Sequence, residues 1–190
     1  MIDISSGDRR IDAFLADGYM RIRGMSSRFA AAICGHVVRR QTALGITGDI
    51  LEIGTFEGRF FVAMAMLLQP KEHALGIDVF TWPSAKVYDH LLENCAASGL
   101  KPGGYTAWKV DTRSLNANQL RDRLPGGRAR FIHIDGEHIA ECLSHDLARA
   151  KHMVAKKLSC TNGIAGLERS ENLLMLTHRF IPASVYRQRK

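Results

Sequence analysis

The feature that most constrains the fold is a repeated alternation between residues 48 and 155. Four short apolar runs, each typical of a buried strand, are each followed by a longer stretch with helical spacing. The apolar runs are DILEIG, ALGIDVF, YTAWKV and ARFIHID, and the helical stretches are GRFFVAMAMLLQ, SAKVYDHLLENCAASG, SLNANQLRDRL and HIAECLSHDLARAKHMVA. Strand followed by helix, four times over, indicates βαβ units. We therefore predict an α/β fold whose parallel sheet of about four strands carries helices on both faces.

The segments on either side of this region differ from it. Apolar residues recur three to four positions apart in IDAFLADGYMRI and in SSRFAAAICGHVVRRQTAL, which predicts two helices, the second beginning at Ser26 or Ser27 and ending near Gly45. Near the C-terminus, ERSENLLMLTHRF has helical spacing and IPASVYRQ could form one short strand. We expect a single domain with three parts: an N-terminal helical segment (1–45), a core (46–155) and a divergent tail (156–190).

Composition narrows the class of protein. The chain is 46% hydrophobic and 24% charged, as is usual for a globular protein, and no stretch approaches the ~20 apolar residues of a membrane span. The N-terminus, MIDISSGDRRIDAF, lacks the basic-then-apolar order of a signal peptide, so we predict a cytoplasmic protein without a membrane partner. The net charge of +7 comes from scattered Lys and Arg residues, which argues against a specific nucleic-acid partner. The cysteines have no CxxC spacing and are expected to be reduced, structural thiols: Cys34, Cys95, Cys142 and Cys160.

An acidic residue closes or follows every predicted strand. These residues are Glu52, Asp78, Asp111 and Asp135. In open parallel sheets the ligand binds outside the carboxyl ends of the strands, so we expect these carboxylates to border a ligand site. Asp78 follows the first strand-to-helix turn by about 20 residues, a spacing at which an acidic side chain can accept hydrogen bonds from both hydroxyls of a ribose.

The turn in LEIGTFEGRF indicates which ligand this is. Gly54 and Gly58 permit a close approach of the backbone, but Phe56 occupies the place of the middle glycine of the dinucleotide motif GxGxxG. Glu52 and Glu57 would repel phosphates and tolerate a cationic aminoacyl group. The turn therefore favours a ligand with a ribose and a positive centre, although a tight turn without a ligand is an equally simple interpretation of the glycines.

Together these motifs resemble a known family. The run E-I-G-T-F-E-G, followed by G-I-D, by V-D-T and by F-I-H-I-D-G-E-H, is similar to the class I S-adenosylmethionine-dependent methyltransferases. The similarity is closest to the branch that contains the macrocin-type sugar O-methyltransferases and the cephalosporin-hydroxylase-like proteins. It covers about residues 45 to 155 and implies a Rossmann-like sheet that binds S-adenosylmethionine.

The resemblance implies roles for individual residues at the cofactor. Glu52, Gly54 and Gly58 would form the loop at the methionine end, with backbone contacts from Thr55 and Phe56. Asp78 would hold the ribose hydroxyls, and Asp111 with Thr112 would face the adenine edge. Trp82 could stack on the adenine or cover the pocket, but we expect it to be a partly buried packing residue.

At the acceptor end, the resemblance places Asp135 nearest the transferred methyl group, where it would bind magnesium beside His138. A neutral imidazole can take the proton from a substrate hydroxyl, and magnesium would lower the pKa of that hydroxyl. The alternative is that Asp135 and Glu137 cap the helix that follows. His133 lies inside the strand pattern and is expected to be a hydrogen-bonded core residue.

The first prediction of function is therefore an S-adenosylmethionine-dependent methyltransferase that methylates a hydroxyl of a small molecule, of sugar or natural-product type. The later strands of a complete fold of this class are not recognisable in residues 156–190. This leaves two consequences open. The strand ARFIHID would be an open apolar edge unless the tail or a second subunit of a homo-oligomer covers it. The protein could also be a catalytically silent binding or oligomerisation module, whereas Phe56 disfavours a nucleotide-dependent oxidoreductase.

Overall fold

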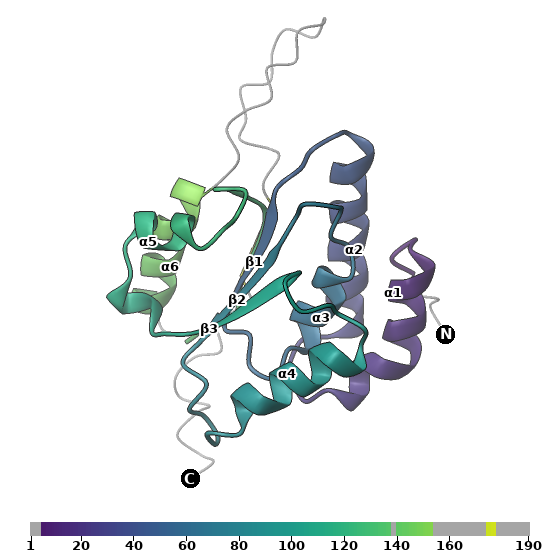
Figure 1. Cartoon of the computed structure of the whole chain (residues 1–190), viewed down its shortest axis with the longest axis horizontal. Helices are drawn as coiled ribbons and strands as arrows, with labels where there is room; N and C mark the ends of the chain where they lie inside the picture. Colours follow the sequence, from purple (N-terminus) through teal and green to yellow (C-terminus); the bar gives the residue numbers. More distant parts are fainter. Residues whose placement is uncertain (1–4, 138–139, 154–173, 178–190) are drawn as a thin grey trace, which may run out of the picture.

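The computed structural model describes residues 5–137, 140–153 and 174–177 of the chain (Figure 1). The strands are β1 (Asp49–Ile53), β2 (Ala74–Asp78), β3 (Tyr105–Lys109), β4 (Ala129–Ile134) and β5 (Leu174–Thr177). The α-helices are α1 (Arg9–Ala13), α2 (Arg28–Ala43), α3 (Arg59–Ala65), α4 (Val87–Ala97), α5 (Ala117–Asp122) and α6 (Ala140–Met153). All strand pairs are parallel, and the five strands follow the order β3-β2-β1-β4-β5. Helices α5 and α6 lie on one side of the sheet and α1 to α4 on the other (Figure 1).

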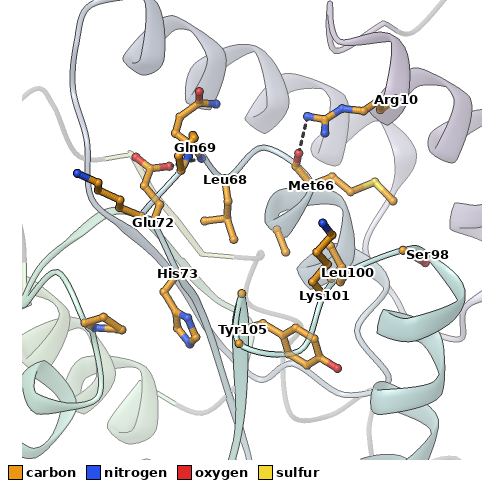
Figure 2. A pocket seen from close by; sticks show the side chains of 17 residues that line it. Arg10, Met66, Leu68, Gln69, Glu72, His73, Ser98, Leu100, Lys101 and Tyr105 are labelled. Atoms are coloured by element: carbon orange, nitrogen blue, oxygen red, sulfur yellow. Dashed lines mark hydrogen bonds between the residues drawn. The ribbon is translucent and has the colours of Figure 1, made fainter.

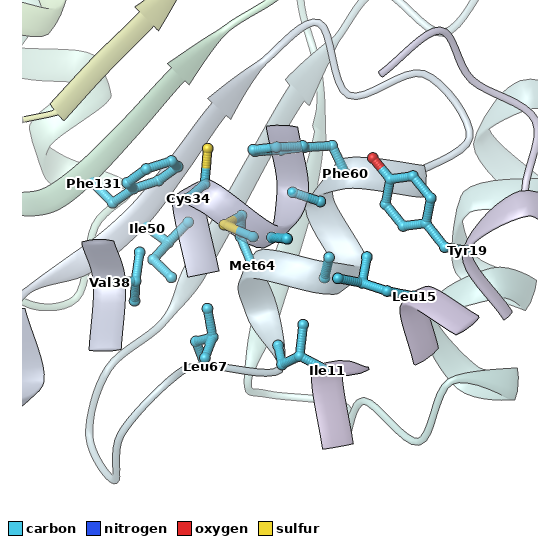
Figure 3. Packing of buried hydrophobic residues seen from close by; sticks show 13 residues of the cluster. Ile11, Leu15, Tyr19, Cys34, Val38, Ile50, Phe60, Met64, Leu67 and Phe131 are labelled. Atoms are coloured by element: carbon cyan, nitrogen blue, oxygen red, sulfur yellow. The ribbon is translucent and has the colours of Figure 1, made fainter. Parts of the chain in front are cut away.

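The predicted α/β fold is confirmed, with each of the four apolar runs forming a strand. Both faces of the sheet are buried. Ile50 and Phe131 pack under α2 and α3 (Figure 3). Leu51 and Ile132 pack under α5 and α6 on the other face. This two-sided burial explains why β1 and β4 read as continuous apolar runs.

The N-terminal helices also follow the sequence pattern. Helix α1 begins after Asp8, whose side chain accepts hydrogen bonds from two backbone amides, and the chain continues through one π-helical turn (Phe14–Gly18) and one 3₁₀ turn (Tyr19–Arg21). Helix α2 begins after Ser27, whose hydroxyl accepts from the amide of Ala30 at 3.1 Å, as predicted. No helix among residues 5–137 and 140–153 is long and apolar enough to cross a membrane.

The C-terminal segment corrects one prediction and confirms another. Residues Leu174–Thr177, inside the stretch expected to be helical, form β5 and pair with β4 in the register Ile132 to Met175. The helical prediction is wrong there because the unpaired amides and carbonyls of a strand edge override a weak local periodicity. The tail thus covers the edge of β4, which removes the physical reason for a second subunit at that edge. The short strand predicted at IPASVYRQ lies outside the described residues.

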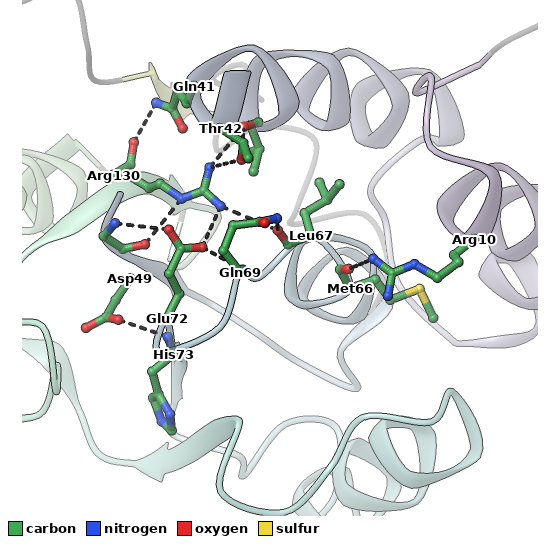
Figure 4. A network of polar contacts seen from close by, with 12 residues as sticks. Arg10, Gln41, Thr42, Asp49, Met66, Leu67, Gln69, Glu72, His73 and Arg130 are labelled. Atoms are coloured by element: carbon green, nitrogen blue, oxygen red, sulfur yellow. Dashed lines mark hydrogen bonds and ion pairs between the residues drawn. The ribbon is translucent and has the colours of Figure 1, made fainter. Parts of the chain in front are cut away.

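A buried arginine organises the edge where the strands begin. The guanidinium of Arg130 donates to the Val38 carbonyl at 2.9 Å and forms an ion pair with Glu72 at 2.6 Å (Figure 4). Glu72 also accepts from the amides of Gly48 and Gln69, at 3.1 and 2.8 Å. Every oxygen of this carboxylate is therefore used inside the fold, and the network connects α2, β4 and the loops before β1 and β2.

Three cysteines fall inside the described residues. Cys34, Cys95 and Cys142 are buried, free thiols, as expected, whereas Cys160 lies outside the described part of the chain. Burial raises the pKa of Cys34 and of Cys95 to about 12. Both thiols are thus poor nucleophiles and act as small apolar core groups.

Candidate functional site

The candidate site lies at the edge where the parallel strands end. Strand β1 is between β2 and β4, so the turn at Gly54 is flanked by Asp78 on one side and Asp135 on the other. Asp111 follows β3 and is two strands away from β1. Three of the four predicted strand-end carboxylates, Glu52, Asp78 and Asp135, are therefore brought together around one turn.

Gly54 is required by the contact between two loops. Its φ is +86°, and a Cβ at this position would lie 2.2 Å from the carbonyl oxygen of Asp135. The amide of Asp135 donates to the Ile53 carbonyl at 2.8 Å, which holds the two loops against each other. Gly58, with φ +87°, precedes α3 and leaves no room for a side chain beside Leu91. The turn consequently exposes backbone rather than side chains to the site.

Asp78 has a structural role that the sequence analysis did not detect. One carboxylate oxygen accepts from the amide of Phe56 at 2.9 Å, and the other accepts from the amide of Phe80 at 2.8 Å. Both phenylalanines have positive φ, 51° and 50°, a conformation that side-chain-bearing residues rarely adopt. Asp78 thus holds two left-handed residues in place, and the second lone pair of each oxygen remains available to a ligand.

Glu52 is the most unusual side chain of the site. It is buried, with 4% of the side chain exposed, and its Oε1 lies 2.7 Å from Nδ1 of His133. Its Oε2 is buried and has no hydrogen-bond partner within the described residues. Burial raises the pKa of Glu52 to about 7; the nearby carboxylates of Asp135 and Asp78 add to this effect and His133 opposes it. A buried oxygen without a partner is rare, and it is suited to accept from a cationic ligand group.

Glu57 does not contribute free negative charge, contrary to the sequence-based expectation. Its Oε1 is 2.9 Å from Nη1 of Arg23 and 3.1 Å from Nδ1 of His90. The guanidinium of Arg23 also lies 5.6 Å from the ring centre of Phe56. Arg23 lies outside every sequence motif and reaches the turn only through the tertiary fold. Of the two glutamates expected to exclude phosphates, only Glu52 has no Lys or Arg partner within the described part of the chain.

At the expected adenine side, the carboxylate of Asp111 is already paired with Arg113. Asp111 accepts from the amide of Arg113 at 2.9 Å and pairs with its guanidinium at 2.6 Å, contacts that lower the pKa of the Asp111 carboxyl. Thr112 begins the short 3₁₀ turn that follows. Trp82 is 60% exposed, with its ring 5.9 Å from that of Phe56, so its assignment as a partly buried packing residue is wrong. Thr55 is buried and turns its hydroxyl toward the Ile77 carbonyl, at 3.4 Å.

Of the two residues expected at the metal and the base positions, the structure describes only Asp135. Asp135 is half-buried and directly follows β4, whereas His138 lies outside the described residues. Within the described residues there is no group of three or more His, Cys, Asp or Glu side chains that could hold a metal ion. Asp135 is one carboxylate of the kind that magnesium uses, and the described residues do not complete a group of three such ligands around it.

An open cavity of about 930 Å³ lies elsewhere, where β2 and β3 begin (Figure 2). Its lining includes Arg10, Lys71, His73, Lys101 and Tyr105. Because β2 and β3 begin at this edge, the cavity is at the opposite end of the sheet from Asp78. Ligands of open parallel sheets bind at the carboxyl ends, so the cavity is not the candidate site.

The fold defines a Rossmann-like α/β protein, and this edge is its candidate ligand site, around a glycine turn. Residues 51–157 match the family model described as a methyltransferase domain, and the chain belongs to this family. The resemblance on which the sequence-based prediction depended is thereby confirmed. No curated protein sequence matches the chain.

Solved structures with the same fold include methyltransferases. A putative O-methyltransferase from Klebsiella pneumoniae is 22% identical, with 78% of this chain and 62% of that chain covered and a TM-score of 0.53. The O-methyltransferase TomG from Streptomyces achromogenes is 17% identical, with 78% of this chain and 61% of that chain covered and a TM-score of 0.52. CalS11, a TDP-rhamnose 3′-O-methyltransferase, is 18% identical, with 78% of this chain and 72% of that chain covered and a TM-score of 0.50. At these identities the likeness shows the fold, and the chain covers less than two thirds of the first two proteins.

Proposed function

We propose that the protein is an S-adenosylmethionine-dependent methyltransferase that acts on a hydroxyl group of a small molecule, of sugar or natural-product type. The observation that carries the proposal is the buried Oε2 of Glu52, which lacks a partner in the described residues and belongs to the residue two positions before Gly54. Membership of the methyltransferase-domain family supports the reaction class. TomG, solved in complex with S-adenosylmethionine and involved in tomaymycin synthesis, and the sugar methyltransferase CalS11 support the cofactor and the acceptor class.

The residues at this edge fit the cofactor. Oε2 of Glu52 can accept from the ammonium of the methionine end, and the bare backbone at Gly54 allows that end to approach the turn. Asp78 can accept from the ribose hydroxyls with the lone pairs that its two amide contacts leave free. When bound, S-adenosylmethionine supplies a methyl group on a positively charged sulfur. We assign the adenine contacts to Asp111 and Thr112.

On the acceptor side, the oxygen that attacks the methyl group must lose its proton. We assign the removal of this proton to His138 and the orientation of the acceptor to Asp135, which follows β4 beside the turn. The methyl group would pass from the sulfur to the acceptor oxygen, and His138 would take the hydroxyl proton. Binding of magnesium at Asp135 is tested by titrating the protein with S-adenosylmethionine in the presence and in the absence of the ion.

The proposal is tested first by binding. Calorimetric titration with S-adenosylmethionine should show micromolar affinity. Asp78→Ala should weaken it more than about tenfold, about 1.4 kcal/mol, since both the ribose contact and the geometry of the turn are lost. Asp122→Ala, which removes an exposed carboxylate of α5, is the matched control and should bind as the wild type does. Wild-type protein that gives no heat and no thermal stabilisation would refute the proposal.

Turnover is tested separately. Labelled methyl groups should be transferred from S-adenosylmethionine to at least one member of a panel of sugars and phenols. Transfer that requires magnesium would assign the ion to the acceptor end. Tight cofactor binding without transfer to any hydroxylated acceptor would instead favour the catalytically silent module.

A further inference from the structure

His133 and Glu52 form a pair that the fold places side by side. The two residues are opposite each other in the register of β1 and β4, so their side chains leave the same face of the sheet. Their side chains are 2% and 4% exposed, and Nδ1 of His133 lies 2.7 Å from Oε1 of Glu52. The ring of Phe60 covers the imidazole, with the two ring centres 4.0 Å apart. The imidazole is therefore held in place by its packing.

Stability alone does not explain this pair. It follows the apolar row of Ile50 and Phe131 on the same face, where two apolar side chains would pack without a cost of desolvation. Replacing buried ionic pairs with apolar residues is often neutral or stabilising. The pair also leaves one carboxylate oxygen, Oε2, buried without a partner in the part of the chain that the structure describes. These features point to a ligand at that oxygen.

We propose that His133 is a positioning residue for cofactor binding. By holding Oε1 of Glu52, it keeps Oε2 directed at the ammonium group of the cofactor's amino-acid end. This inference rests on the proposed function, because it assumes that S-adenosylmethionine binds at the turn. His133 itself does not touch the cofactor. Its effect is confined to ligands that carry the amino-acid group, which a merely structural role would not produce.

Two ligands and three variants test the inference. S-adenosylhomocysteine carries the amino-acid group, and 5′-methylthioadenosine lacks it but keeps the ribose and adenine. His133→Leu removes the nitrogen that contacts Glu52, whereas His133→Asn has a similar size and places an amide nitrogen near the position of Nδ1. His133→Gln places its nitrogen near Nε2 instead, so it is a second variant without the contact. Calorimetry gives both dissociation constants for each protein, and thermal melts verify that each is folded.

The expected result is selective. His133→Leu and His133→Gln should weaken S-adenosylhomocysteine by roughly tenfold, about 1.4 kcal/mol, and leave 5′-methylthioadenosine within about twofold of the wild type. His133→Asn should retain most of the affinity for S-adenosylhomocysteine. Equal weakening of both ligands, or unchanged binding in all three variants, would overturn the positioning role while leaving the proposed function intact. A wild-type protein that binds neither ligand would overturn both.

Discussion

Replacing Glu52 by Gln should make the protein more stable at neutral and alkaline pH while weakening cofactor binding. The side chain is buried beside His133, and burial is the largest cause of its raised pKa of about 7. Glutamine has nearly the same shape and can still accept from Nδ1 of His133, but it carries no charge to desolvate. The substitution therefore removes the cost of a buried charge and keeps the contact.

The size and direction of the effect follow from linkage. The folded-state pKa of about 7 is above the ordinary value of 4.5, so the folded protein keeps a proton that the unfolded chain has lost. Below pH 4.5 Glu52 is protonated in both states, and the folded wild type pays no cost for a buried charge. The free energy of unfolding falls as the pH rises toward 7, and above pH 7 the full cost of burying the ionised carboxylate is present. Between pH 5 and pH 8 this loss is about 2–3 kcal/mol, and Glu52→Gln should not show it.

Urea unfolding of both proteins at pH 5, 6, 7 and 8 measures the effect. The difference in free energy of unfolding, variant minus wild type, should grow with pH by about 2–3 kcal/mol, since the contributions of groups that do not interact with Glu52 cancel. Glu93→Gln, which replaces an exposed glutamate of α4, is the control and should give a flat difference. A difference for Glu52→Gln that stays flat or falls with pH would refute the view that Glu52 is ionised at a cost.

Two further predictions concern the framework around the site. Arg130→Met should cost about 3–5 kcal/mol in urea unfolding because it leaves Glu72 buried without its cation, and adding Glu72→Gln should recover part of the loss; additive losses would contradict the pairing. Gly54→Ala should abolish cofactor binding, since its Cβ would meet the Asp135 carbonyl at 2.2 Å. The control Gly99→Ala, with φ +77° and no atom within 4 Å, should cost about 1 kcal/mol and leave binding unchanged, and similar effects of the two substitutions would count against the loop contact.

The sequence by itself determined the sheet and the position of the site. A strand buried on both faces must be apolar, and the helix that follows it must show a stripe of apolar residues. The continuous apolar runs and the helical spacing are therefore both visible in the sequence. The carboxyl ends of parallel strands share one edge, so Asp78 and Asp135 could be assigned to the same edge before any distance was known. The cap of α2 at Ser27 was equally predictable, because its contact is with the next turn.

Only the tertiary structure decided which groups meet at that edge. The pairing of Glu52 with His133 depends on the register between β1 and β4, and that of Glu57 with Arg23 depends on how the N-terminal helices pack; neither contact is local in sequence. The strand β5 shows the same limit, because a segment with helical spacing became a strand when β4 offered it an open edge. Local periodicity depends on each segment alone, whereas hydrogen bonds and buried charges depend on partners that the fold brings from elsewhere in the chain.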